Sequence, residues 1–375
     1  MGGQLGRVLA AVGILALIAA IVVRPGDARA AASQDWSPFV LVTGLLLIGI
    51  VADDDGLFAA VGHQLARVAP NGTSLFVGST ILVGLVTAVL NLDTSVAFLT
   101  PVLVYTARSR GQGEGALLYG SLLLSNAGSL LLPGSNLTNL IVLGQRHLSG
   151  GAFLARMWAP ALAALVVTAI VVAAFEHRSF RGRAAEQKPP ERPVLGLGAS
   201  AVVLAVGLVV VLSSPALPVA IVGATAIAIR LAGKKDRPAR VARVLGVPVL
   251  VGLFGVAVAL GTLGRAWSGP ASLLSHFGSW ATAFFAAGTS VVVNNLPAAS
   301  LLSARAPKHP FSLLIGLNLG PNLFVSGSLA WLLWLRTARS AGAAPSIAKA
   351  SRIGFVAVPL SMAAALSLLS LTGSS

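Results

Sequence analysis

Long runs of apolar residues without charged side chains recur along the whole chain, and a transmembrane helix needs about 20 such residues. Only 10% of the residues are charged, whereas soluble domains carry about 25%. The pattern predicts an all-α polytopic membrane protein with about ten transmembrane helices, because several runs have the length that a bilayer requires. The runs lie near residues 8–23, 38–52, 74–91, 95–107, 115–132, 157–175, 196–213, 216–231, 246–262, 280–293, 311–317, 323–335 and 353–371.

The positive charge of the chain is confined to short segments. There are 26 Lys and Arg against 11 Asp and Glu, a net charge of +15. The basic residues gather chiefly at 176–192 and 233–243, between apolar runs. Two runs with a tight turn at 213–215 separate these segments, so both fall on one side, which the positive-inside rule makes cytoplasmic. The charge therefore indicates orientation in an inner (plasma) membrane, and we expect no nucleic-acid partner.

Reactive side chains are scarce. The chain has no cysteine, and no two of its five histidines stand three or four residues apart, as a zinc site on a helix would require. A membrane-embedded enzyme or assembly scaffold would need a metal cluster or a nucleophile with a neighbouring base, and we find neither. We expect a protein that is not an enzyme and that holds no metal and no cofactor.

The N-terminal part of the chain has two interpretations. Residues 8–23 fit a first transmembrane helix, but Arg7 before them and Ala-Arg-Ala at 28–30 after them are also typical of a cleavable signal peptide. We expect the uncleaved helix. Further along, residues 56–69 separate apolar from polar side chains and predict an amphipathic helix at the membrane interface. Near the other end, Trp331 and Trp334 are expected as interfacial anchors.

Polar breaks interrupt the apolar runs at similar spacing in two halves of the chain. The first half has breaks at 91–95 and 125–139, and the second half has breaks at 294–297 and 318–328. Interrupted helices in corresponding positions of two halves are the best sequence indication of a transporter site.

Asp93 is the one acid that stands between two apolar runs; the other ten, Asp35 among them, are expected in loops or at the ends of spans. A carboxylate at membrane depth is costly and is usually functional. We interpret Asp93 as a proton- or cation-coupling group at the tip of a re-entrant hairpin. The alternative is an interfacial acid that caps the helix opened by Thr94 and Ser95.

The breaks are rich in amides and hydroxyls. Unwound backbone at membrane depth is tolerated where it lines a cavity, and half-helices that begin there aim N–H groups at an anion or a polar neutral solute. The alternatives are an ordinary polar loop at 125–139 and helix–helix hydrogen bonding by Asn294 and Asn295. The predicted substrate-binding residues are Asn91, Thr94, Ser95, Ser125, Asn126, Ser135, Asn136, Thr138, Asn294, Asn295, Asn318, Asn322, Ser326 and Ser328.

Over about residues 38–365 the chain resembles the arsenite efflux permease family. That family belongs to an ion-transporter superfamily that also holds sodium/proton antiporters and divalent-anion/sodium symporters. The motifs that carry the resemblance match together in order and spacing, which makes the superfamily assignment specific. They are residues 53–56, 93–101, 135–139 and 294–297, the last followed by 319–321 and 327–330.

The resemblance implies two inverted repeats, each with a re-entrant hairpin and a discontinuous helix, and a solute site where the hairpin tips and the unwound segments meet. Asp93 falls on the acid of the first hairpin tip, and Asn294 and Asn295 fall on the second tip. The implied parts are an N-terminal transmembrane helix and loop (1–37), a first repeat (38–175), a basic cytoplasmic linker (176–195) and a second repeat with a preceding helical pair (196–371).

Three positions depart from the family pattern. Asn126 and Asn318 stand where family members usually carry acids, and Asn322 stands where a basic residue is common. The site is therefore less charged, which leaves the coupling ion and the substrate open. The chain is also expected to lack one N-terminal span of the family.

The resemblance implies secondary active transport. The main hypothesis is proton-coupled efflux of arsenite or antimonite by alternating access, with Asp93 as the proton carrier; a soluble ATPase partner is known in the family. Arsenite is largely neutral at neutral pH, so amides and hydroxyls suit it. The alternative is a sodium- or proton-coupled transporter of carboxylates or other anions. A homodimer is kept as a further expectation.

Overall fold

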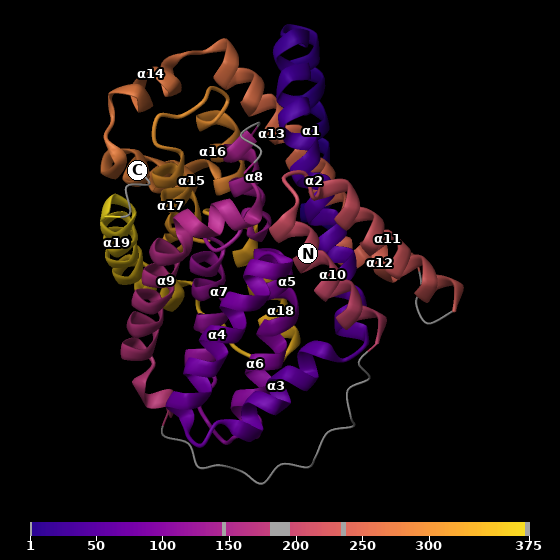
Figure 1. The fold of residues 1–375 in the computed structure, drawn as a ribbon, viewed down its shortest axis with the longest axis vertical. Helices are drawn as coiled ribbons and strands as arrows, with labels where there is room; N and C mark the ends of the chain where they lie inside the picture. Colours follow the sequence, from indigo (N-terminus) through magenta and orange to yellow (C-terminus); the bar gives the residue numbers. More distant parts are fainter. Residues whose placement is uncertain (1, 145–147, 181–195, 234–237, 372–375) are drawn as a thin grey trace.

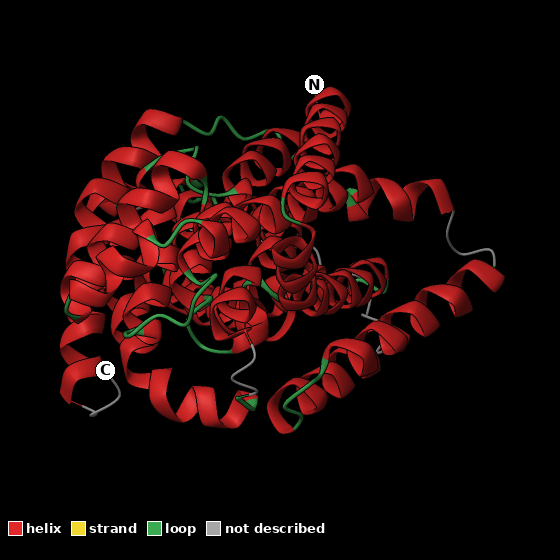
Figure 2. Cartoon of the chain, turned by 90° about the horizontal axis from the view of Figure 1, so that it is seen from above, coloured by secondary structure: helices red, strands yellow, loops and turns green. Residues whose placement is uncertain are grey.

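The computed structural model describes residues 2–144, 148–180, 196–233 and 238–371, and every regular element in these ranges is a helix. The all-α prediction is confirmed (Figure 2). Most of the predicted linker, residues 181–195, lies outside the described ranges. In chain order the elements are α1 (Gly2–Val23), α2 (Pro25–Asp54), α3 (Leu57–Val68), α4 (Gly72–Leu90), α5 (Leu92–Thr94), η1 (Ser95–Leu99), α6 (Thr100–Ser109), α7 (Gly115–Gly128), η2 (Pro133–Ser135), α8 (Leu137–Leu143), α9 (Gly150–Phe175), η4 (His177–Phe180), α10 (Leu197–Val211), α11 (Ala216–Ala232), α12 (Pro238–Leu245), α13 (Val247–Ala266), α14 (Gly269–His276), α15 (Ser279–Val293), α16 (Asn295–Leu302), α17 (Pro310–Leu319), η5 (Gly320–Leu323), α18 (Leu329–Ser340) and α19 (Ile347–Leu371).

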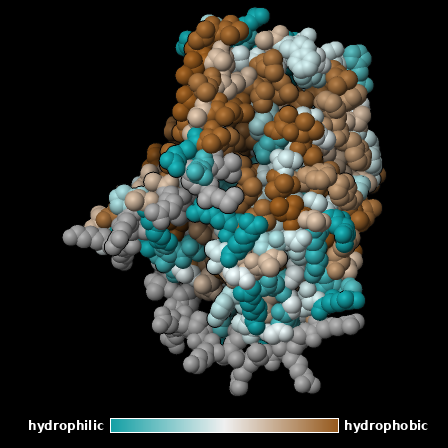
Figure 3. All heavy atoms as spheres, turned by 180° about the vertical axis from the view of Figure 1, so that it is seen from behind, coloured by the Kyte–Doolittle hydropathy of each residue, from teal (hydrophilic) through white to brown (hydrophobic). Residues whose placement is uncertain are grey.

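Six helical segments of the described chain are long and apolar enough to cross a membrane, by length and composition. Three shorter apolar helices, α10, α11 and α15, accompany them. The prediction of a polytopic membrane protein is therefore confirmed. Figure 3 shows apolar side chains over the upper part of one face of the molecule and polar side chains gathered toward its lower end.

Helix α2 extends through the length of the bundle, because its 30 residues span about 45 Å. It packs against α10, α11 and α13. The loop predicted before residue 38 is wrong: residues 25–37 are the first turns of α2. Polar residues interrupt the apolar run here, but the helix buries Asp35 and partly buries Gln34 against other helices. A hydropathy pattern cannot separate such residues from a loop.

The last turn of α2 lies beside the described ends of both basic segments. The Asp55 carboxylate accepts from Arg230 of α11 at 2.5 Å and from the Gly198 N–H of α10 at 2.7 Å. Arg240 of α12 donates two hydrogen bonds to Asp54, at 2.5 and 2.8 Å. Both basic segments thus reach the same end of the bundle, which the positive-inside rule makes the inner end.

Two helical hairpins turn at an asparagine with positive φ. Helix α4 ends at Asn91 (φ 91°, ψ 167°), and α5, η1 and α6 lead back. Helix α15 ends at Asn294 (φ 77°, ψ 148°), and α16 leads back. No other non-glycine residue of the described chain has positive φ. The predicted breaks at 91–95 and 294–297 are confirmed, and each is built on a sparsely populated backbone conformation.

The two hairpins enter the bundle from opposite ends (Figure 1). The first hairpin opens at the inner end, where Gly72 at the start of α4 lies against Phe180. The second opens at the other end, where Ser279 Oγ lies 3.3 Å from His309 Nδ1 and Ser303 lies beside Gln34 in the early turns of α2. Opposite hairpins are what an inverted repeat predicts; the repeat itself stays a prediction.

Trp331 and Trp334 do not lie at an interface. Both are fully buried, and their indole N–H groups donate to the carbonyls of Pro321 at 2.7 Å and Leu118 at 2.9 Å. The interfacial-anchor interpretation is wrong, because each indole N–H finds a backbone acceptor inside the protein and needs no contact with water.

Candidate functional site

The tip of the first hairpin is fixed by Asn91. Its side-chain Oδ1 accepts from the Thr94 N–H at 2.8 Å and so caps the helix that follows. Residues Ser95–Leu99 then form a π-helix, a local widening that is frequent at functional sites. Ser95 Oγ lies 3.2 Å from Ser125 Oγ of α7. The tip is thereby joined to the helix that carries the next polar break.

Asp93 projects from this tip without a partner among the described residues. Leu92 and Thr94 on either side are buried, whereas Asp93 keeps a partly exposed side chain. No hydrogen bond or ion pair from the described residues reaches its carboxylate. The cap of the helix is Asn91, so the alternative interpretation of Asp93 as the capping residue is wrong. A carboxylate at this position remains available to a proton, a cation or a solute.

Asn318, at the end of α17, is the centre of a buried amide network. Its Oδ1 accepts from Ser129 Oγ at 2.5 Å and from Asn136 Nδ2 at 2.8 Å. Its Nδ2 donates to Asn139 Oδ1 at 2.7 Å and to the Leu314 carbonyl at 2.8 Å. All four residues with side chains in this network are buried. The second broken helix is thus fastened to the first by an amide with all its hydrogen-bonding capacity used.

A second amide pair adjoins this network and consists of Asn126, three residues before Ser129, and Asn322, four residues after Asn318. Asn126 Nδ2 donates to Asn322 Oδ1 at 2.9 Å, and Asn322 Nδ2 donates to the Leu123 carbonyl at 3.1 Å. Together with the Asn318 network, this pair joins the break after α7 to the break after α17. The ordinary-loop interpretation of 125–139 is wrong, because this segment is packed inside the protein.

Five of the predicted site residues each hold a buried polar atom without a hydrogen-bond partner among the described residues. Native proteins leave few buried polar atoms unsatisfied, so a cluster of them indicates a place for water or a ligand. The atoms surround the first hairpin tip and the breaks of both discontinuous helices, and they include donors and acceptors. They are Asn91 Nδ2, Thr94 Oγ1, Asn126 Oδ1, Thr138 Oγ1 and Ser328 Oγ.

The second hairpin tip forms a separate group. Asn294 Nδ2 donates to the Ser326 carbonyl at 3.2 Å, and the Asn295 N–H donates to the Gly327 carbonyl at 2.8 Å. Ser326 is exposed. These residues fasten the tip to the unwound segment before α18, and in the described part of the chain they make no hydrogen bond with the Asn318 network. Ser135 does not bond to Asn318 itself, but it adjoins the network: its hydroxyl lies against the Ser129 and Leu132 carbonyls and accepts from Asn139 Nδ2 at 3.5 Å.

Sequence reasoning missed two members of the site, Ser129 and Asn139. Both are fully buried and bond to Asn318. They belong to the same amide- and hydroxyl-rich stretch as the predicted residues, so the signal was present. Asp35 was missed for another reason. It was expected in a loop, but it lies inside α2 with 2% of its surface exposed.

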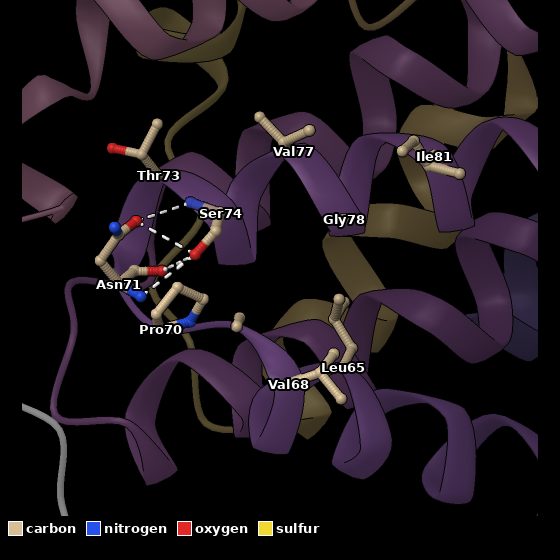
Figure 4. A pocket seen from close by; sticks show the side chains of 10 residues that line it. Leu65, Val68, Pro70, Asn71, Thr73, Ser74, Val77, Gly78 and Ile81 are labelled. Atoms are coloured by element: carbon tan, nitrogen blue, oxygen red, sulfur yellow. Dashed lines mark hydrogen bonds between the residues drawn. The ribbon is translucent and has the colours of Figure 1, made fainter.

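Two hollows accompany these elements. A groove of about 520 Å³ runs between α3 and α4, and its lining includes Leu65, Val77 and Ile81 (Figure 4). It lies away from the breaks, and its apolar lining suits lipid. A second cavity, of about 430 Å³, reaches Pro133 and Gly134 of the break after α7. The second cavity is therefore the one connected with the site.

Interrupted helices whose polar breaks meet inside a bundle of apolar spans define a membrane transporter. The chain belongs to the family described as citrate transporter, whose family model matches residues 1–334. It is a multi-pass protein of the inner membrane, and its relatives are transporters and membrane proteins, not enzymes.

Relatives and a solved structure agree with this assignment. The chain is 28% identical over 325 residues to the inner membrane protein YbiR of Escherichia coli K12, covering 82% of this chain and 81% of the relative. It is 26% identical over 360 residues to an arsenical pump membrane protein of the same organism, covering 86% and 83%. The YdaH transporter of Alcanivorax borkumensis has the same fold, with a TM-score of 0.59 and 15% identity over 92% of this chain and 86% of that one. The resemblance to arsenite permeases and their superfamily is confirmed.

Proposed function

We propose that this protein is a proton-coupled secondary transporter that exports a small neutral oxyacid of the arsenite type by alternating access. One observation carries the proposal: Asp93, whose carboxylate has no partner in the described part of the chain, lies on a hairpin tip that adjoins buried breaks made of amides and hydroxyls. The solute would lie at the breaks and the proton on Asp93.

The chemistry of the breaks suits a neutral solute with several hydroxyl groups. Asn91 Nδ2 offers a donor, Asn126 Oδ1 offers an acceptor, and the Thr94 hydroxyl can serve as either. Among the described residues, no Lys or Arg side chain bonds to this network, so a multiply charged anion would lack a counter-charge there. Arsenite is largely uncharged at neutral pH and needs none.

Proton binding on Asp93 would change the charge of the hairpin tip. The ionised carboxylate is stable only while it faces water, because a charge at membrane depth is costly. A protonated Asp93 would lower that cost and let the tip close over the site. Such a difference between two states is what couples a proton to the movement of a solute.

Transport of a carboxylate or another anion, with sodium or a proton, is the second candidate. Two observations favour it: the family is described as citrate transporter, and α8, α16 and α18 all begin at the breaks. Helix N-termini present free N–H groups and a partial positive charge to anions. A soluble ATPase and a second copy of the chain remain expected partners of either candidate.

The test is arsenite flux in everted membrane vesicles from a host without its own arsenite exporters. Wild type, Asp93→Asn and the control Glu114→Gln, which changes an acid near the inner end of the same hairpin, are compared with and without a pH gradient. We expect gradient-driven flux in wild type and Glu114→Gln and its loss in Asp93→Asn. Sodium-dependent movement of citrate, without any arsenite flux, would establish the second candidate and overturn the first.

A further inference from the structure

A second buried carboxylate lies away from the hairpin tips. Asp35 stands inside α2 with 2% of its surface exposed, and its Oδ2 atom is buried without a hydrogen-bond partner. Burial of a carboxylate that leaves one oxygen without a partner is costly, and such residues in membrane proteins usually carry out a function. The site described above makes no use of Asp35.

The charged group that faces Asp35 is Arg265 of α13. No ion pair within 4 Å joins them among the described contacts, because the guanidinium is engaged elsewhere: it donates to Gln34 Oε1 at 2.5 Å and to the Gly261 carbonyl at 3.0 Å. Asp27, also on α2, is a second acid whose charge acts on Arg265. The adjoining helices α8 and α16 have no charged residue, and Ser300 of α16 supplies the hydroxyl that faces Asp35.

Asp35 lies where four helices meet, and two of these follow the polar breaks. Its neighbour Gln34 donates to the Ile141 carbonyl of α8 at 2.8 Å, and Ser303 at the end of α16 donates to the same carbonyl at 3.4 Å. Helix α8 is the second half of the first broken helix, and α16 is the second leg of the hairpin that turns at Asn294. A change of charge on Asp35 therefore changes the electrostatic environment of both α8 and α16.

Water can approach this place from the outer end. The cavity of about 430 Å³ is lined by Gln34 and Ser37 of α2, Gly134 of the break after α7, and the turn at Ser213 and Ser214. That turn joins α10 to α11 at the end opposite the Asp55–Arg230 ion pair. Asp35 does not itself line the cavity, but its chain neighbours Gln34 and Trp36 do. Asp93, in contrast, lies on a tip that packs near Gly49, closer to the inner end of α2.

We propose that Asp35 is a second proton-binding carboxylate of the transport cycle, which exchanges its proton with the outside through the cavity at Gln34. The inference rests on the proposed coupled transport. One proton passes between water in the cavity and the Asp35 carboxylate, and no other bond forms or breaks. Neutral Asp35 removes one of the two carboxylates that offset the positive charge of Arg265 beside α16, the other being Asp27, whereas ionised Asp35 restores it. Proton exchange thus shifts the balance between two arrangements of α8 and α16.

The test uses the full-length protein in proteoliposomes and compares Asp35→Asn with Asp27→Asn. Two fluxes are measured with arsenite: exchange at equal pH on both sides, and net transport driven by a pH gradient. We expect Asp35→Asn to keep exchange within about twofold of wild type and to lose gradient-driven transport, while Asp27→Asn keeps both. Retained gradient-driven transport in Asp35→Asn would overturn the proposal. So would the loss of both fluxes, because it marks a structural role.

A spectroscopic titration separates this proposal from the proposed function. Infrared difference spectra of purified protein across a pH series record the carbonyl stretch of protonated carboxyl groups. We expect one titrating band to vanish in Asp35→Asn and to persist in Asp93→Asn. If wild type moves no arsenite but this band behaves as expected, the proposed substrate fails and the proton site stands. If no titrating band depends on Asp35, the proton site is excluded whatever the transport result.

Discussion

Asn126 and Asn322 share a buried hydrogen bond of 2.9 Å although 196 residues separate them in the chain. Each belongs to a different broken helix, so the bond joins the two breaks directly. A charged pair at the same positions would attract strongly but would carry a large desolvation cost. The amide pair keeps the contact without the charge, which is consistent with a neutral solute at this place.

Truncation of Asn318 should lower the stability of the protein more than truncation of an exposed site residue. Asn318→Ala leaves Asn136 Nδ2 and Asn139 Oδ1 buried without a partner. At about 1–2 kcal/mol for each unmatched group, we expect the free energy of unfolding to fall by about 2–4 kcal/mol. Denaturant unfolding of the purified protein in detergent measures it. The control Ser326→Ala removes an exposed hydroxyl that donates to the Val291 carbonyl at 2.8 Å, and because water competes for this bond the variant should lose less than about 1 kcal/mol. Equal losses in the two variants would contradict the role given to Asn318.

Two substitutions of Asn91 separate the contribution of its backbone conformation to stability from the contribution of its capping hydrogen bond. Asn91→Gly and Asn91→Ala both remove the bond from the Thr94 N–H, but only glycine accepts φ 91° without strain. The alanine variant should therefore be less stable than the glycine variant by about 1–2 kcal/mol. Melting temperatures of the two purified variants measure this difference in stability. The same order is expected at Asn294, where φ is 77°; no difference at either position would mean that the tips relax.

Much of the fold could be predicted from the sequence, because a membrane leaves few solutions for apolar runs. The breaks at Asn91 and Asn294 were predictable, since polar residues inside apolar runs must line a cavity or pack in protein. The same reasoning located Asp93. These features are local: each is visible within about ten residues of the chain.

The rest depends on contacts between distant segments. Nothing local pairs Asn126 with Asn322, or distinguishes Asn318, which uses all its hydrogen-bonding capacity, from Ser326, which is exposed. The prediction that Asp35 lies in a loop or at the end of a span was wrong for the same reason. A polar residue near the start of a span looks like part of a loop in the sequence, and only contacts with neighbouring helices show that it is buried. Trp334 was misassigned because the Leu118 carbonyl that accepts from it lies in another helix.

The ion pairs at the inner end of α2 should matter more than those at the surface. Asp55 and Arg230 have side chains only 15% and 11% exposed. Asp55→Asn weakens the bonds to Arg230 and to the Gly198 N–H, and we expect a loss of about 1–3 kcal/mol. Glu114→Gln breaks the more exposed pair with Arg108 and should cost less than about 1 kcal/mol. Unfolding of both variants at low and high salt is the measurement; a larger loss for Glu114→Gln would show that burial does not rank these pairs.

His309 gives a pH dependence of stability whose sign can be worked out. It lies in the segment between α16 and α17, where burial, and secondarily the positive charge of Lys308, lowers its pKa below the ordinary value for histidine. The folded protein then binds fewer protons at this site than the unfolded chain, so stability falls as the pH decreases through the unfolded pKa of about 6.5. His309→Gln should flatten the melting temperature measured between about pH 5 and 8. Lys308→Ala should flatten it partly, because the pKa of His309 rises toward its ordinary value. If His309→Gln keeps the full slope, another group is responsible for it.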